Sequence, residues 1–229
     1  MDPRLHTDRH YEAELKQLHL SILEMGGLVE KQIANAVSAL VNRDDAQARA
    51  TIEADHTVNR LDVEIDELCL RLLALHQPAA KDLRLITTGL KITTDLERVG
   101  DMAVNLCERA LELNREPQLK PFIDIPRMAA IAQAMLRESL DAFVREDVAL
   151  ALKVCRDDDS IDQLTGQLFR ELSSYMVEQP QTISRAIALL FIAKYLERIA
   201  DHATNIGEMV VFMVKGKSIR HLDQVPPSV

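Results

Sequence analysis

Two segments with the same pattern of acidic residues lie 100 positions apart in this chain. Residues 96–108 match residues 196–208 at seven of thirteen positions, and every acidic position is among the seven. In each segment a Glu precedes an Asp by four residues: Glu97 precedes Asp101, and Glu197 precedes Asp201. Because residues four apart lie on one face of a helix, each segment is predicted to present two carboxylates side by side.

A second pair of oxygen-bearing side chains precedes each segment along the chain. Asp55 and Asn59 are four residues apart, and Asp158 and Asp162 repeat this spacing in the second half. Both pairs are also predicted to lie on helices, where they would occupy one face. Each half of the chain therefore carries four oxygen-bearing side chains on two helices.

Two interpretations of these acidic faces remain open from the spacing alone. Like charges four residues apart destabilise a helix by about 0.2–0.5 kcal/mol, and no basic residue at that spacing offsets the pairs that consist of two carboxylates. A bound cation would relieve this repulsion, and oxygen ligands suit Mg, Mn, Fe or Zn. The alternative is an ordinary solvated polar face. Because the pattern is repeated in both halves, we give the metal interpretation the same weight as the solvated face.

Other kinds of chemistry find little support in the sequence. A di-iron carboxylate enzyme on a helical bundle needs two Glu-x-x-His motifs, and only Glu53-x-x-His56 fits. No glycine-rich phosphate loop, nucleophile elbow or Cys/His zinc spacing is present in the sequence. The sequence patterns therefore give an enzyme only weak support.

Composition and charge narrow the class of protein further. The chain has 229 residues, of which 47% are hydrophobic and only 3% aromatic, which is typical of a helical bundle rather than a β-sandwich. A net charge of −9 argues against nucleic-acid binding. A small basic cluster, Lys215, Lys217 and Arg220, is interpreted as a solvated tail. No signal peptide or membrane-spanning run is recognised, and three widely spaced cysteines suit a reducing compartment, so we expect a cytoplasmic protein.

The prolines divide the chain into long segments without helix breakers. Proline inside a helix costs about 3 kcal/mol, so the eight prolines are expected to mark helix ends. Six helices are predicted, at residues 8–41, 45–75, 78–114, 127–145, 147–177 and 182–214. Residues 115–125, between the third and fourth helices, hold two prolines and no helical period, and they include the predicted linker.

These elements form two copies of one unit. The fold is predicted to be all-α, with two tandem, pseudo-symmetric three-helix bundles of six long helices. The first bundle is expected over residues 1–115, the linker over 116–125, the second bundle over 126–216 and a C-terminal tail over 217–229. In the third helix, apolar residues at alternating spacings of three and four define the buried seam.

The repeated motifs resemble those of the PhoU family. Each half has Asp-x-x-(Val/Ile)-(Asn/Asp)-x-Leu in its second helix and Leu-Glu-Arg-(Ile/Val)-x-Asp-x-Ala-x-Asn in its third, and residues 78–86 resemble the family's entry to that helix. The resemblance spans about residues 11–215. It implies a non-catalytic negative regulator of phosphate uptake and of the phosphate regulon, which couples the ATPase subunit of the phosphate ABC transporter to a sensor histidine kinase. It further implies a homodimer that associates with membrane complexes only peripherally.

The resemblance also implies which residues hold metal. Carried over by position, the ligands in the first half are Asp55, Asn59, Glu97 and Asp101, and those in the second half are Asp158, Asp162, Glu197 and Asp201. Asn59 is neutral where Asp162 is charged, so the first site is expected to hold its metal more weakly.

Two other functions remain as alternatives to the regulator. The acidic faces could belong to a metal-dependent enzyme or a metal store on a helical bundle. They could also be polar packing in a purely structural bundle. Bound metal without turnover would favour the regulator over the enzyme.

Overall fold

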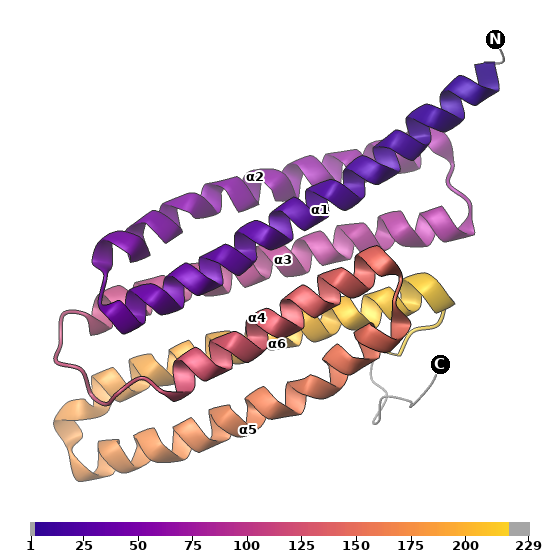
Figure 1. The fold of residues 1–229 in the computed structure, drawn as a ribbon. Coiled ribbons are helices and arrows are strands. Elements are labelled where there is room, and N and C mark those ends of the chain that lie inside the picture. The colour runs from indigo at the N-terminus through magenta and orange to yellow at the C-terminus, as the bar shows by residue number, and fades with distance from the viewer. Residues whose placement is uncertain (1–2, 220–229) are drawn as a thin grey trace.

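The computed structural model describes residues 3–219 of the chain, and in this range it is almost entirely helical (Figure 1). The elements are α1 (Pro3–Asn42), α2 (Asp45–His76), α3 (Ala80–Leu113), α4 (Asp124–Arg145), α5 (Val148–Glu178), the short 3-10 helix η1 (Pro180–Thr182) and α6 (Ile183–Lys215). Helices α1–α3 form one antiparallel bundle and α4–α6 form the other. The predicted fold class is confirmed.

The turn between the first two helices of each bundle shows the repeat most clearly. Asp44 begins α2 by accepting a hydrogen bond from the Gln47 backbone N–H at 2.9 Å, and Asp147 begins α5 by accepting one from the Leu150 N–H at 3.0 Å. Each cap follows a residue with positive φ, Arg43 or Glu146. The two turns lie 103 residues apart and have the same geometry, so positions in α1 and α2 correspond to positions 103 later in α4 and α5.

Helix boundaries depart from the predicted ones by two residues or more at three places. Helix α1 begins at Pro3 rather than residue 8, and α3 begins at Ala80 rather than at 78. Helix α4 begins at Asp124, so Pro126 lies inside its first turn. Proline is accommodated there because the first N–H groups of a helix have no intrahelical partner.

The core runs without interruption from one bundle to the other. Helix α3 packs against α6 and α1 packs against α4, whereas α2 and α5 contact only helices of their own bundle (and, for α5, η1) within the described range. The predicted seam of α3 is buried, from Leu96 at 0% exposure to Leu113 at 7%. Side chains from all six long helices form one hydrophobic cluster.

The two ends of the chain extend beyond what the structure describes. Residues 1–2 and 220–229 lie outside it, so Arg220 of the predicted basic cluster and most of the predicted tail are not placed. Lys215 and Lys217 are exposed, and Ile219 is 6% exposed. Among the described helices, none combines the length and the hydropathy needed to cross a membrane.

Candidate metal centres

The eight predicted ligands fall into two groups, each at the interface of two helices that pack together. The first acidic site comprises Asp55 and Asn59 on α2 with Glu97 and Asp101 on α3. The second acidic site comprises Asp158 and Asp162 on α5 with Glu197 and Asp201 on α6. Helices α2 and α3 pack directly, as do α5 and α6.

In the first acidic site, two side-chain amides donate hydrogen bonds to the buried carboxylate of Asp55. Asp55 is 9% exposed, and its Oδ1 accepts a hydrogen bond from Gln32 Nε2 of α1 at 3.1 Å. Its Oδ2 accepts one from Asn59 Nδ2 at 3.0 Å. Gly100 lets α3 approach this carboxylate, since a Cβ there would lie 3.0 Å from Asp55 Oδ1. Asn59 therefore donates to Asp55 in this structure, and both carboxylate oxygens already have a partner.

The exposed half of the first acidic site includes a carboxylate that the sequence reasoning missed. Partial burial and the charge of Asp101 raise the pKa of Glu97, and the charges of Asp62 and Asp55 raise it further. Asp62 lies seven residues after Asp55 on α2, hence two turns along the same face. That spacing is the signal that could have identified Asp62 in advance.

In the second acidic site, the corresponding carboxylate lacks a partner. Asp158 Oδ1 is buried and accepts no hydrogen bond. Burial raises the pKa of Asp158 from 3.8 to about 6, and the charges of Asp201, Asp162 and other nearby carboxylates contribute to the increase. An unpaired buried carboxylate oxygen among other carboxylates is the environment that a cation relieves.

The residue in Gln32's position explains this difference. By the 103-residue offset, Met135 of α4 corresponds to Gln32 of α1, and it is 2% exposed. A thioether has no hydrogen to donate, so it cannot bind Asp158 as the amide of Gln32 binds Asp55. Likewise, Asp162 occupies the position that corresponds to Asn59, whose amide donates to Asp55 in the first site. The second site therefore lacks both of the amide donors found in the first.

The other second-site carboxylates interact as well. Partial burial and the charge of Glu197 raise the pKa of Asp162 and of Asp201. Lys194, three residues before Glu197 on α6, forms an ion pair with it and lowers both of these pKa values in part. The four predicted ligands of this site thus lie within electrostatic reach of one another.

The acidic pairs are less isolated than their spacing predicts. Besides Lys194, Arg98 Nε lies 3.6 Å from Glu97 Oε2, and Arg98 Nη1 lies 3.4 Å from Asp101 Oδ2. Glu97/Asp101 and Glu197/Asp201 therefore have compensating charges that the i,i+4 spacing does not identify. Basic residues one or three positions away reach the carboxylates, although none stands at the i,i+4 spacing.

The donor set of the second acidic site fits a metal ion better than that of the first. Across the described residues, no three carboxylate oxygens of either site lie within 4.8 Å of one another, so a metal ion would have to draw them together. Four carboxylates with an unpartnered buried oxygen suit a hard or borderline cation. The first site offers a carboxylate already bound by amides.

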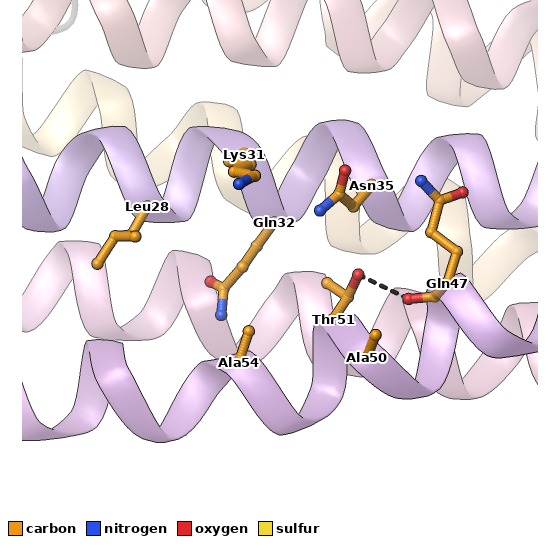
Figure 2. A pocket seen from close by; sticks show the side chains of 8 residues that line it. All are labelled: Leu28, Lys31, Gln32, Asn35, Gln47, Ala50, Thr51 and Ala54. Carbon is orange, nitrogen blue, oxygen red and sulfur yellow. Dashed lines mark hydrogen bonds between the residues drawn. The ribbon is translucent and has the colours of Figure 1, made fainter.

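A pocket adjoins the first acidic site on its α1 side. It has a volume of about 190 Å³ and lies between α1 and α2. Figure 2 shows its lining residues, with the Gln32 side chain extending from α1 toward α2. The Thr51 hydroxyl is turned back onto its own helix, where it donates to the Gln47 carbonyl at 2.9 Å. Gln32 thus connects the pocket to Asp55.

Comparison with known proteins agrees with the doubled architecture. The family model described as the PhoU domain matches the chain twice, over residues 22–110 and 125–210. The two matches cover most of both helical bundles. Each match contains one acidic site.

Characterised relatives match along nearly the whole chain. The phosphate-specific transport system accessory protein PhoU homolog of Pseudomonas putida is 41% identical over 95% of this chain and 85% of its own length. PhoU of Escherichia coli K12 is 37% identical over 95% of this chain and 90% of its own length.

Solved structures share the fold as well as the sequence. The crystal structure of PhoU from Pseudomonas aeruginosa superposes with a TM-score of 0.87 at 42% identity, covering 90% of this chain and all of that one. The phosphate transport system regulatory protein PhoU from Streptococcus pneumoniae gives 0.86 at 32% identity, covering 91% and 99%. The repeated motifs, the paired bundles and these matches together show that the chain belongs to the PhoU family.

Proposed function

We propose that this protein is a non-catalytic accessory regulator of phosphate-specific transport, acting in the cytoplasm. The observation that carries the proposal is identity of 37–41% over 95% of the chain to relatives named as accessory proteins of that transport system. The structural match to the pneumococcal transport regulator supports it. A regulator of this kind lowers phosphate uptake and keeps the phosphate regulon repressed when phosphate is plentiful.

The proposed partners are the ATPase subunit of the phosphate ABC transporter and a sensor histidine kinase. The word accessory in the relatives' names supports association with the transporter. Coupling to the kinase extends the family resemblance, and we propose it together with a homodimer that binds these membrane complexes peripherally.

Metal binding at the acidic sites is the second part of the proposal. We propose that the second acidic site holds an ion such as Mg, Mn, Fe or Zn and that the first binds more weakly. The unpartnered Asp158 Oδ1 and the raised pKa of three second-site carboxylates support this order. Occupancy would tie α5 to α6 and so set the surface that these helices offer to a partner.

The regulatory proposal is tested by deleting the gene and measuring phosphate uptake together with expression of a phosphate-regulon reporter. We expect uptake and reporter expression in high phosphate to rise, and the wild-type gene to restore both. A pull-down at physiological salt should recover the transporter ATPase and the kinase domain. Unchanged uptake and reporter expression, with neither partner recovered, would refute the regulator.

The metal proposal is tested on protein purified without chelator. Bound metal is quantified for the wild type and for Asp158→Asn, Asp55→Asn and Asp157→Asn. Asp157→Asn is the matched control, because Asp157 lies on the same helix but is partly exposed and pairs with Lys153 at 2.8 Å. Asp158→Asn should lose the most metal and Asp157→Asn none. Equal metal content in all four proteins would contradict the assignment.

The same protein separates the regulator from a metal-dependent enzyme. The metal-loaded wild type is assayed for oxidase and phosphatase turnover. We expect bound metal without turnover. Robust turnover that is lost in Glu197→Gln would favour the enzyme and remove the non-catalytic assignment.

A further inference from the structure

A cluster of two histidines and a glutamate lies at the end of the first bundle, away from both acidic sites. His10 and Glu14 are one turn apart on α1, and His76 is the last residue of α2. In the described part of the chain, these residues form the one group of three or more His, Cys, Asp or Glu side chains whose ligand atoms all lie within 4.8 Å. The sequence does not reveal the group, because His76 is 62 residues from Glu14.

One carboxylate oxygen is shared by the two imidazoles. Glu14 Oε2 lies 3.4 Å from His10 Nδ1 and 3.0 Å from His76 Nε2. Ligand atoms about 2.0–2.1 Å from a tetrahedral zinc ion are separated from one another by about 3.3 Å. These two separations are therefore close to those of a tetrahedral site, and the two imidazole nitrogens lie within 4.8 Å of each other.

Two of the three ligands are held in place by surrounding groups. The side chains of Glu14 and His76 are 16% and 14% exposed. The Tyr11 ring lies 4.7 Å from the His76 ring, and its hydroxyl donates to Asp82 Oδ2 of α3 at 3.1 Å. Burial, with Asp82 as a contributor, raises the pKa of Tyr11 to about 12, so this hydroxyl stays protonated and keeps donating.

The third ligand is exposed, and the other oxygen of Glu14 has a partner of its own. The His10 side chain is 71% exposed and can close over the site from outside. Arg71 Nε lies 3.4 Å from the other oxygen of Glu14, Oε1. This contact leaves Oε2 for an ion while it fixes the carboxylate plane.

We propose that His10, Glu14 and His76 form a third metal site, which binds a divalent transition-metal ion such as zinc with a solvent molecule as fourth ligand. Two imidazoles and one carboxylate favour zinc, cobalt, nickel or copper over magnesium and calcium, which prefer ligand sets made only of oxygen. The site therefore disfavours Mg²⁺, which the all-oxygen acidic sites can accept, and the proposal does not depend on the transport function.

An ion at this position would link the beginning of α1 to the end of α2. Figure 1 shows the N-terminal turns of α1 projecting past the other helices of the first bundle. Among residues 10–18, the first hydrophobic side chain of α1 with zero exposure is Leu18, whereas Tyr11 and Leu15 are only partly buried against the core. Binding would stabilise these turns and slow hydrogen exchange of their amides.

The test uses the full chain, stripped of metal with chelator and titrated with Co²⁺ as a spectroscopic substitute for zinc. We expect the visible absorption of tetrahedral Co²⁺, which Zn²⁺ displaces and excess Mg²⁺ does not. His76→Gln and Glu14→Gln should weaken binding by about tenfold or more. His10→Gln, at an exposed position, tests the site without affecting the fold.

Two controls distinguish this site from other metal binding. His56→Gln removes an exposed histidine of α2 that lies 3.9 Å from Glu53 in an i,i+3 pair, and it should leave the Co²⁺ spectrum unchanged. Asp158→Asn should also leave it unchanged. Hydrogen exchange at residues 10–17 should slow on adding Zn²⁺ to the wild type but not to His10→Gln. An octahedral spectrum that persists in His10→Gln and His76→Gln would show the cluster to be an ion-pair network only and would overturn the proposal.

Discussion

The side-chain amide of Gln32 donates a 3.1 Å hydrogen bond to Asp55 Oδ1, and this bond joins α1 to α2 inside the first bundle. At the corresponding place in the second bundle, Met135 has no hydrogen to donate and Asp158 Oδ1 has no partner. One chain thus contains corresponding carboxylates in two states, one bound by two amides and one with a buried oxygen that has no partner. The first predictions test this contrast.

Replacing Gln32 with Met should leave Asp55 Oδ1 without a partner, as Asp158 Oδ1 is, while the Asn59 bond to Oδ2 remains. Asp55 would lose a buried donor, and loss of such a partner costs about 1–3 kcal/mol. Removal of Gln32 Oε1, which is itself buried and unpartnered, offsets part of this cost. We expect Gln32→Met to lower the free energy of unfolding by about 1 kcal/mol, measured by urea denaturation. Gln17→Met, at an exposed position of α1, should have little effect.

Asp158→Asn should stabilise the metal-free protein at pH 7.5. The pKa of Asp158 in the folded protein, about 6, exceeds its ordinary value of 3.8, so folding favours the protonated form. The contribution of Asp158 to the free energy of unfolding is therefore fully present below pH 3.8 and is lost as the pH rises through 6. Asparagine does not ionise, so the variant does not lose stability in this way. Allowing for solvent screening, we expect a gain of about 1–2 kcal/mol.

The pH dependence provides the check on that expectation. Unfolding of the wild type and the variant is compared in chelator at pH 7.5 and near pH 4. The difference should shrink at the lower pH, where the wild-type carboxyl is also protonated. A gain of the same size at both pH values would show that the charge of Asp158 is not its cause.

Gly100→Ala should disturb the first acidic site from the α3 side. Its Cβ would lie 3.0 Å from Asp55 Oδ1 and 3.4 Å from Gln32 Oε1, so the hydrogen-bonded pair must shift. Overpacking costs about 1–3 kcal/mol, while alanine gains up to about 1 kcal/mol in helix propensity. We expect a net loss of about 1 kcal/mol in thermal or urea unfolding. Gly27→Ala, with no atom within 4 Å of the new Cβ, should instead stabilise.

The contact between Asp95 of α3 and His202 of α6 should couple the two bundles. His202 Nδ1 lies 2.7 Å from Asp95 Oδ1, and Asn205 Nδ2 donates to the same oxygen at 3.3 Å. A double-mutant cycle of Asp95→Ala and His202→Ala should give an interaction energy of about 0.5–3 kcal/mol. Additive effects of the two substitutions would show that this contact contributes no coupling between α3 and α6.

Much of the fold follows from local signals in the sequence. Prolines and capping aspartates mark the helix ends, and the buried seam of α3 follows the spacing of its apolar residues. The beginning of α4 is less predictable: the predicted helix begins at residue 127, after Pro126, whereas Asp124 and Ile125 before the proline are also helical. Proline fits at several positions in the first turn of a helix, where N–H groups have no intrahelical partner. The presence of a proline alone therefore does not fix where the helix begins.

Only the part of each acidic site that depends on spacing within one helix could be predicted from the sequence. The i,i+4 spacing identifies the carboxylates, but Gln32 and Met135 approach from α1 and α4 and belong to neither motif. Lys194, three residues before Glu197, neutralises part of its charge, and the i,i+4 spacing does not identify this contact. The His10–Glu14–His76 cluster needs the antiparallel pairing of α1 and α2 to bring its members together. In each case the missing information is which side chain meets which across a helix interface.

The confinement of α2 and α5 to their own bundles has a consequence for signalling. Each acidic site joins one of these peripheral helices to α3 or α6, which together with α1 and α4 form the continuous interior. An ion bound as we propose would therefore join α2 to α3, or α5 to α6, without directly touching the α3–α6 and α1–α4 contacts between the bundles. The two sites could then be occupied separately, each altering only its own outer helix.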